Sequence, residues 1–288
     1  MFELVLTGLA MGCIYALLAL GFVLILNASG AINFAQGELV MLGGFVVVWL
    51  TADVALPWYA VLVLAVGAMV VLGVALERFA FRPLKGKPFV TVFISTIGFG
   101  IVLRNVALVV WGPTPRSLPA LFQPDVIRLG GAVISTQHLF IVGVTLVLLL
   151  ALQAFFVRTR TGVWIRAAAQ DEETARLLGV RTGRTMVLTF VLSSLLAGLA
   201  GFLLAPVFFI YPDIGHLLIL KLFIAVVIGG FGSVPGAILG GLFLGLIEVL
   251  AAAYVSSLYK DVIAFAVLML FLVLKPEGIL GEPISEKV

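Results

Sequence analysis

Nine apolar segments joined by short polar connections limit the fold of this chain more than any other feature. They cover residues 4–26, 35–50, 57–77, 89–110, 138–157, 187–210, 218–230, 237–255 and 262–274. Of the 288 residues, 63% are hydrophobic and 11% are charged, whereas a soluble domain carries roughly 25% charged residues. A chain this apolar cannot cover its surface with polar groups, so its solvent is largely lipid. The sequence therefore predicts an all-α polytopic membrane protein with a single transmembrane domain over residues 1–288.

The number of membrane crossings follows from the lengths of these segments. A spanning helix needs about 20 residues, and the segments 35–50, 218–230 and 262–274 are shorter. Short segments interrupted by glycine are typical of broken helices that are buried in the protein. We expect about nine transmembrane segments; the alternative has eight, with residues 218–255 partly re-entrant.

The order of long and short segments occurs twice along the chain. A glycine-rich helix, a short broken segment and two further helices make up residues 1–110, and the same order returns over residues 187–274. Five spans separate corresponding helices, so the two copies have opposite orientations. This pattern predicts an inverted repeat, which is typical of transporters with the pathway between the two copies.

The basic residues predict the orientation. Lys and Arg cluster in the connection 78–87, in the connection 158–184 and at the C-terminus, whereas Trp111–Gln137 carries only Arg116 and Arg128. Cytoplasmic loops carry the excess of Lys and Arg. We therefore expect the N-terminus outside, the C-terminus in the cytoplasm, and a multi-pass protein of the cell (inner) membrane.

Glycines inside the apolar segments predict close helix packing. Gly8 and Gly12, Gly236 and Gly240, and Gly241 and Gly245 each have the spacing that lets helix backbones approach. The glycines of Gly229–Gly236 predict a tight turn between two membrane segments.

No catalytic constellation is legible in the sequence. His138 and His216 lack metal-ligand spacing, and no nucleophile–base motif is present. We expect Arg104 and Lys221 to snorkel from near helix ends, and Glu248 to be a deeper anchor. The sequence predicts a protein that is not an enzyme and that holds no cofactor or metal.

The first candidate site is the polar stretch Asn33, Gln36 and Glu38, which directly follows the helix break at Ser29–Gly30. Asn33 can cap the next helix, and Glu38 falls in its first turns, where the helix dipole favours a carboxylate. An unpaired charge in an apolar environment is costly, so Glu38 must be paired, protonated or facing a polar cavity. Two interpretations stay open: a structural polar anchor for a broken helix, or part of the lining of a substrate pathway.

The second candidate site is a cytoplasmic stretch, 163–179, which predicts one amphipathic helix. Glu172 and Arg176 form an i,i+4 pair, and Gly179 suits a C-terminal stop. Its small apolar face comprises Ala168, Ala175, Leu178 and Gly179. A face of small residues favours close docking of a partner; the alternative is a helix lying on the membrane surface.

The sequence resembles the permeases of branched-chain amino-acid ATP-binding-cassette importers, specifically the shorter, LivH-type subunit. The resemblance covers nearly the whole chain and rests on Gly12–Leu17, Ile32–Leu42, Ala167–Val180, Val226–Ala237, Tyr259–Asp261 and Lys275–Gly281. Gln36 stands where the family motif often has His, so the chain departs from the motif at that position.

The resemblance implies a set of partners and a mechanism. The partners are a second homologous permease subunit, two cytoplasmic ATPase subunits, an extracytoplasmic substrate-binding protein and an amino-acid substrate, with membrane lipid around the chain and no nucleic acid. The loop 158–185 would couple the chain to the ATPase, through Ala167, Ala168, Asp171, Glu172, Ala175 and Gly179. Transport would proceed by alternating access.

Two alternatives stay open at this point. Similar permeases serve urea and amide importers, and the sequence does not name the substrate. An ion-coupled secondary transporter would also have inverted repeats, but it usually needs an ion site, and the membrane segments contain no acidic cluster.

Overall fold

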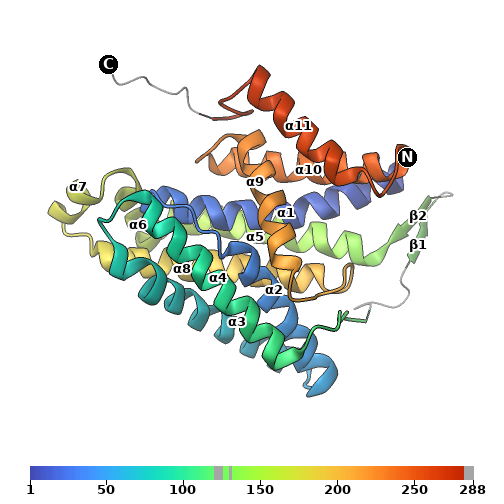
Figure 1. Ribbon diagram of the computed structural model, residues 1–288, viewed down its shortest axis with the longest axis horizontal. Helices are drawn as coiled ribbons and strands as arrows, with labels where there is room; N and C mark the ends of the chain where they lie inside the picture. The colour runs from blue at the N-terminus through green and yellow to red at the C-terminus, as the bar shows by residue number, and fades with distance from the viewer. Residues whose placement is uncertain (120–125, 130–131, 282–288) are drawn as a thin grey trace. The chain divides into compact units, whose positions relative to one another are not determined.

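The computed structural model describes residues 1–119, 126–129 and 132–281, which are mainly helical (Figure 1). The α-helices are α1 (Phe2–Ser29), α2 (Gln36–Val48), α3 (Trp58–Ala75), α4 (Phe89–Trp111), α5 (Thr136–Arg158), α6 (Arg160–Gln170), α7 (Glu172–Leu177), α8 (Thr182–Leu204), α9 (Ile214–Gly229), α10 (Val234–Tyr254) and α11 (Lys260–Leu274). A π-helical turn, Trp49–Asp53, extends α2, while a π-helical turn, Leu76–Phe81, and a 3₁₀ turn, Arg82–Leu84, extend α3.

A small sheet interrupts this helical architecture. Strand β1 (Val126–Leu129) pairs antiparallel with β2 (Ala132–Ser135), with Val126 opposite Ser135 and Leu129 opposite Ala132. Both strands lie in the connection Trp111–Gln137, where β-branched residue types favour extended structure. The all-α expectation is therefore wrong for this connection.

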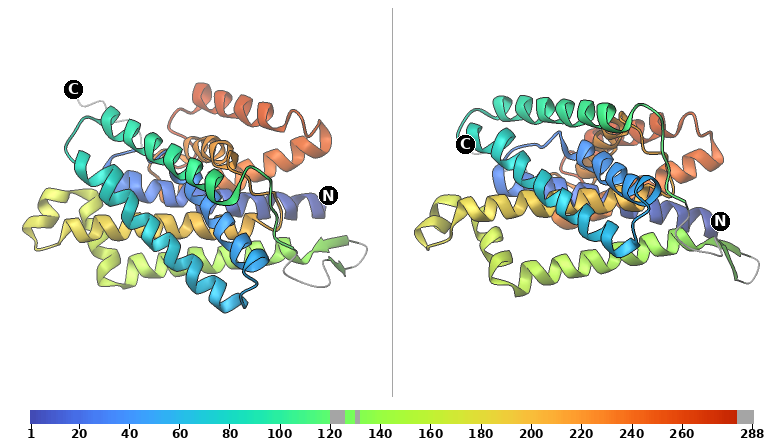
Figure 2. Two further views of the ribbon diagram at one scale, coloured as in Figure 1. Left: turned by 60° about the horizontal axis from the view of Figure 1, so that its bottom comes forward. Right: turned by 90° about the horizontal axis from the view of Figure 1, so that it is seen from below.

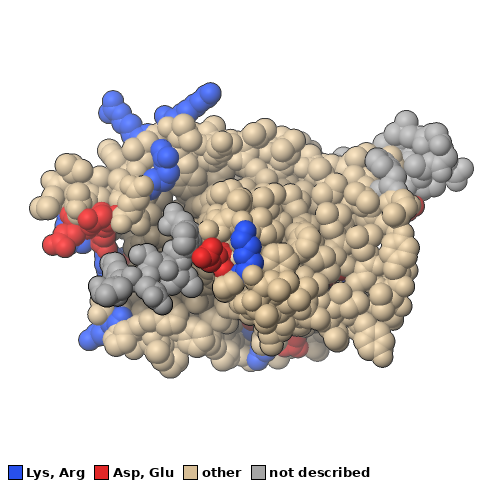
Figure 3. Space-filling view, turned by 90° about the horizontal axis from the view of Figure 1, so that it is seen from above, with Lys and Arg blue, Asp and Glu red and all other residues tan. Residues whose placement is uncertain are grey.

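Each of the nine apolar segments contains a helix, but the helices differ in length. Within the described residues, six are long and apolar enough to cross a membrane: Glu3–Ser29, Trp58–Leu84, Phe89–Trp111, Thr136–Arg158, Thr182–Leu204 and Val234–Tyr254. Helices α2, α9 and α11 have 13, 16 and 15 residues and are shorter than a full span. The chain is thus a polytopic helical membrane protein, while the count of nine complete spans is not confirmed. Uncharged side chains cover most of the face in Figure 3, as a surface in lipid requires.

The chain divides into two compact units. The first unit consists of the described parts of Met1–Val23, Pro119–Thr145 and Leu220–Val288, and the second of Leu24–Leu118 and Leu146–Ile219. Helices α1, α5 and α9 each contribute residues to both units.

In the first unit, glycines bring α1 and α10 into backbone contact. A Cβ added at Gly12 would lie 2.6 Å from the Cα atom of Leu242, and a Cβ at Gly245 would meet the backbone of Gly12. The turn after α9 is as tight as the sequence predicts: Gly230 has a φ of 116°, and the Ser233 hydroxyl caps α10 by accepting from the Gly236 N–H at 3.1 Å. The predicted close helix packing is therefore confirmed here.

In the second unit, α8 packs against both α2 and α3 (Figure 2). A Cβ added at Gly43 of α2 would lie 2.5 Å from the Cα atom of Gly198, and one at Gly73 of α3 would lie 2.8 Å from the Cα atom of Val191. Small residues thus let the backbone of α8 approach the backbones of α2 and α3 closely, as is usual for helices in lipid.

Candidate translocation and coupling sites

The N-terminal ends of the short helices α2 and α9 meet in the second unit. Gly37 and Gly215 are the second residues of these helices, and a Cβ added at Gly37 would meet the Gly215 carbonyl. A Cβ at Gly215 would lie 3.0 Å from the backbone nitrogen of Glu38. The two backbones are therefore in contact, and neither position has room for a side chain.

Asn33 and Gln36 form a buried hydrogen-bonded anchor at the start of α2. They are 1% and 0% exposed. Asn33 Nδ2 donates to Gln36 Oε1 at 3.2 Å, and the Ser193 hydroxyl donates to the same oxygen at 3.0 Å. Gln36 Nε2 in turn donates to the Ser193 carbonyl at 3.4 Å. The stretch is thereby fixed to α8.

The predicted N-cap at Asn33 is wrong. Helix α2 begins at Gln36, and its N-cap residue is Ala35, which makes no side-chain cap. Asn33 Oδ1 instead accepts from the Ala35 N–H at 3.1 Å, so it closes a turn before the helix. The amide acts too early in the chain to reach the first free N–H groups of α2.

Glu38 lies in a space that two glycines leave open. A Cβ at Gly100 would be 3.3 Å from Glu38 Cγ, and a Cβ at Gly215 would collide with the carboxylate. Its Oε2 atom is buried and has no hydrogen-bond partner among the described residues. The start of α9, where the helix dipole is positive, lies beside the carboxylate. Glu38 forms no ion pair with the residues that the structure describes, which leaves the other expected states: protonated or facing a polar cavity.

Arg104 and Asp213 form an ion pair in the second unit. Arg104 Nη1 lies 3.2 Å from Asp213 Oδ1, and both side chains are substantially exposed. Arg104 is thus ion-paired with Asp213, the last residue before α9.

The stretch 163–179 forms two helices rather than the single helix expected. Asp171 is extended, with φ −155° and ψ 106°, and it separates α6 from α7. Its carboxylate accepts from the N–H groups of Glu173 at 2.9 Å and Thr174 at 3.0 Å, so it is the N-cap of α7. Hydrogen bonds from Thr174 hold the pKa of Asp171 below its ordinary value. A carboxylate that caps a new helix ends the preceding one.

The predicted stop at Gly179 is confirmed. Gly179 has a φ of 87°. Its N–H donates to the Arg176 carbonyl at 3.0 Å, and the Val180 N–H donates to the Ala175 carbonyl at 3.0 Å. These two bonds form a Schellman motif, which requires the left-handed conformation that glycine adopts easily.

The residues predicted to form one small face for partner docking divide between the interior and the surface. Ala175 is 3% exposed, Ala167 is half-buried, and Ala168 lines an internal cavity. Leu177 and Leu178 are instead 84% and 79% exposed. The four residues of the predicted face therefore do not lie together: Ala168 and Ala175 are turned inward, whereas Leu178 and Gly179 are exposed, because Asp171 breaks the stretch and changes the direction of the residues that follow it.

Glu172 links α7 to another connection of the second unit. Its carboxylate forms ion pairs with Lys85, from the connection between α3 and α4, and with Arg176 at 2.9 Å. Bonding to Lys85 is the main reason that the pKa of Glu172 is held below its ordinary value. Glu172 thus joins two basic segments that are far apart in the sequence.

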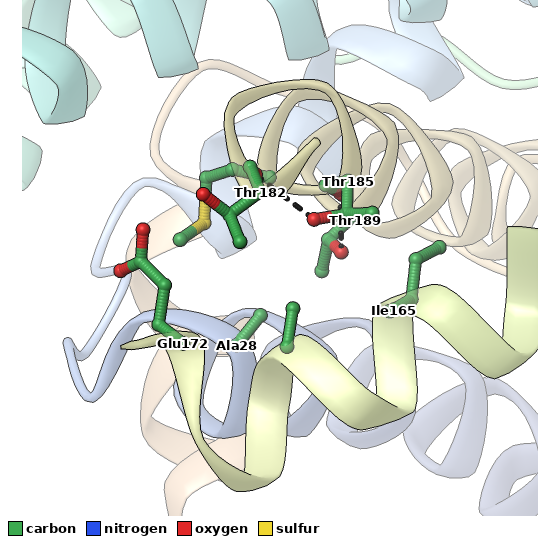
Figure 4. A pocket seen from close by; sticks show the side chains of 8 residues that line it. Ala28, Ile165, Glu172, Thr182, Thr185 and Thr189 are labelled. Carbon is green, nitrogen blue, oxygen red and sulfur yellow. Dashed lines mark hydrogen bonds between the residues drawn. The ribbon is translucent and has the colours of Figure 1, made fainter. Parts of the chain in front are cut away.

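The cavity behind α6 is too small for an amino acid. Figure 4 shows Glu172 and Ile165 across it from the hydroxyls of α8. It is lined by Ala28, Ile165, Ala168, Glu172, Thr182, Thr185, Met186 and Thr189, with a volume of about 10 Å³. Such a space holds about one water molecule. Thr185 and Thr189 donate to carbonyls of their own helix, at 2.9 Å each.

A buried ionic cluster of the first unit was not foreseen as a cluster. Tyr15 donates to Glu248 Oε2 at 2.6 Å, and Lys221 pairs with Glu248 and, at 3.0 Å, with Asp261. The Lys221 side chain is 14% exposed, so it is paired and does not snorkel. The four residues of the cluster come from α1, α9, α10 and α11. Tyr15 and Lys221 are over 200 residues apart in the sequence, so no local sequence pattern indicates that they are in contact. No group of three possible metal ligands occurs in the described part of the chain.

Comparisons with known proteins agree with this architecture. The profile of a family described as "Branched-chain amino acid transport system / permease component" matches residues 4–272. The high-affinity branched-chain amino acid transport system permease protein LivH of Escherichia coli (strain K12) is 40% identical, over 98% of this chain and 96% of that protein.

Two further relatives extend the comparison. The corresponding permease protein BraD of Pseudomonas aeruginosa is 38% identical over the same shares of the two chains, 98% and 96%. Among solved structures, a chain of PsaBC from Streptococcus pneumoniae in complex with Fab shares the fold with a TM-score of 0.50 and 14% identity, covering 94% of this chain and 91% of that one.

Proposed function

The chain belongs to the family of branched-chain amino acid transport permeases, and we propose that its own substrates are branched-chain or related hydrophobic amino acids. It is a permease subunit of an ATP-binding-cassette transporter, a transport component and not an enzyme. The 40% identity with LivH across 98% of the chain is the observation that carries the substrate proposal.

The translocation pathway passes the meeting point of α2 and α9. Both helices are short, both follow a break in the chain, and Gly37 and Gly215 occupy the same position in each. Paired broken helices in the two copies of an inverted repeat are typical of transporter binding sites. The unpaired Glu38 carboxylate supports a role in this pathway, while Asn33 and Gln36 anchor the break and shape the lining.

The membrane topology follows the charge distribution and the inverted repeat. The N-terminus is outside, and the connections 78–87 and 158–184 are cytoplasmic, as is the C-terminus. The repeat consists of α1–α4 and α8–α11, and the span α5, followed by the short helices α6 and α7, links the two copies. With about 1.5 Å of rise per residue, α2 is only about 20 Å long, so it crosses as a segment enclosed by protein and not by lipid.

The segment 158–185 couples the permease to a cytoplasmic ATPase. Leu177 and Leu178 project from a charged, water-exposed segment, and exposed leucines there are suited to a partner's apolar groove. The full assembly contains a second homologous permease, two ATPase subunits and a substrate-binding protein that delivers the amino acid from outside. Each ATPase cycle moves α6–α7 and tilts the attached spans between two states of access.

Uptake by the reconstituted complex tests this function. Liposomes that contain the complex, with ATP inside and loaded binding protein outside, should accumulate leucine, isoleucine and valine but not urea. Uptake of urea in preference to these amino acids would contradict the substrate proposal. Uptake that needs an ion gradient but no ATP would indicate a secondary transporter instead.

A further inference from the structure

Three arginines surround an open pocket where α8 enters its apolar span. The pocket is lined by Arg82, Arg181, Gly183, Arg184, Val187 and Leu188, and its volume is about 510 Å³. Sites for small ligands commonly measure roughly 300–1,000 Å³. All six residues belong to the second unit.

The cations of this pocket are poorly neutralised by the chain itself. Neither Arg181 nor Arg184 makes an ion pair with any residue that the structure describes, and both are exposed. Arg82 has one acidic neighbour, Glu77, at the long distance of 3.8 Å. The pocket therefore combines three guanidinium groups with little compensating negative charge, and the positive end of the α8 dipole adds to it.

The other wall of the pocket is apolar and belongs to a membrane span. Val187 and Leu188 lie about one turn inside α8, whose span is Thr182–Leu204, and Leu188 is 40% exposed. The pocket thus extends from the charged connection before α8 to side chains at the edge of the hydrocarbon layer. A ligand that fits both walls has an anionic head and an apolar tail.

We propose that this pocket binds the phosphate headgroup of an anionic phospholipid. Guanidinium groups bind phosphate oxygens through paired hydrogen bonds, and basic pockets between spans favour anionic lipid headgroups. The lipid phosphate lies among Arg82, Arg181 and Arg184, and an acyl chain lies along Val187 and Leu188. The lipid then joins the connection after α3 to the start of α8, next to the coupling segment.

Native mass spectrometry of the whole purified complex tests this site. The lipids are phosphatidylglycerol and phosphatidylcholine, and the variant is the double substitution Arg181→Gln and Arg184→Gln. The control is Arg158→Gln and Arg160→Gln, which removes the same charge from exposed positions outside the pocket. Wild type and control should retain phosphatidylglycerol over phosphatidylcholine, and the pocket variant should bind phosphatidylglycerol about 100-fold more weakly, since each charge-assisted hydrogen bond to the phosphate contributes a factor of roughly ten.

Several outcomes would overturn the proposal. Equal retention of the two lipids by the wild-type complex would overturn it. This comparison uses only the wild-type protein, so it does not depend on whether a variant folds. Displacement of phosphatidylglycerol by millimolar inorganic phosphate would identify a free-phosphate site instead. Equal losses in the pocket variant and the control would indicate a general charge effect. Release of the ATPase subunits with lipid binding intact would assign the arginines to a protein surface.

Discussion

The junction of α2 with α9 and the segment α6–α7 are both polar breaks in an apolar chain, yet they are built in opposite ways. At the junction, backbones touch through Gly37 and Gly215, and the amides of Asn33 and Gln36 are fully buried. In α6–α7, by contrast, the ion pairs are exposed and Leu177 and Leu178 face outward. The junction is complete within this chain, whereas the segment presents apolar surface that a partner can cover. Substitutions of the packed glycines and buried amides of the junction should therefore lower the stability of the protein, whereas substitutions of the exposed leucines of the segment should reduce transport.

The largest effect on stability is expected from Gly37→Ala. The new methyl group would collide with the Gly215 carbonyl, and overpacking of this kind costs about 1–3 kcal/mol. Gly98→Ala is the matched control, because a Cβ there meets nothing within 4 Å. The thermal unfolding midpoint of the purified complex should fall for Gly37→Ala only; equal midpoints would show that the junction is loosely packed.

Gln36→Leu should have the next largest effect. It removes the acceptor shared by Asn33 Nδ2 and the Ser193 hydroxyl. A buried donor without a partner costs about 1–3 kcal/mol. Ser193→Ala removes one side-chain contact and should cost less in the same unfolding experiment. If Ser193→Ala destabilises the complex more than Gln36→Leu, Gln36 is not the centre of this anchor.

Glu38→Gln separates the two interpretations of the polar stretch. Because Glu38 Oε2 has no hydrogen-bond partner among the described residues, the neutral amide should leave the unfolding midpoint nearly unchanged. A pathway role predicts that leucine uptake nevertheless falls severalfold. Normal uptake together with a lower midpoint would make Glu38 a structural anchor.

The smallest and most local effect is expected at Asp171. Asp171→Ala removes the cap of α7, so hydrogen exchange of the backbone amides of residues 172–178 should accelerate while the rest of the chain is unchanged. Asp171→Asn keeps a capping oxygen and should exchange nearly as slowly as the wild type. If both variants exchange alike, the cap does not hold α7.

The accuracy of the sequence-based predictions follows the range of the interactions involved. The nine apolar segments, the break after Ser29 and the stop at Gly179 depend on local composition and were located well. The helix break at Asp171 could also have been predicted, since an Asp followed by acidic residues is an N-cap signal. The alanine-rich composition of the stretch favoured one continuous helix instead. Ala175 was assigned to a partner surface because helical periodicity identifies a face without showing what covers it.

Longer-range features could not be predicted from a single sequence. Glu248 was expected to be an anchor, but its partners Tyr15 and Lys221 lie on two other helices. The contact between Gly37 and Gly215 joins residues 178 positions apart in the numbering. Neither set of contacts produces a periodic pattern in the sequence, because each depends on how whole helices pack against one another.

Leu178→Arg tests the central claim that the outward-facing end of α7 transmits ATP hydrolysis to the permease. Gln170→Arg adds the same charge at another exposed position and is the control. Leucine uptake and the ATPase activity stimulated by loaded binding protein are measured together in liposomes containing the full complex. The account predicts that both fall severalfold for Leu178→Arg and stay near the wild-type level for Gln170→Arg. Undiminished uptake and stimulation in Leu178→Arg would contradict it.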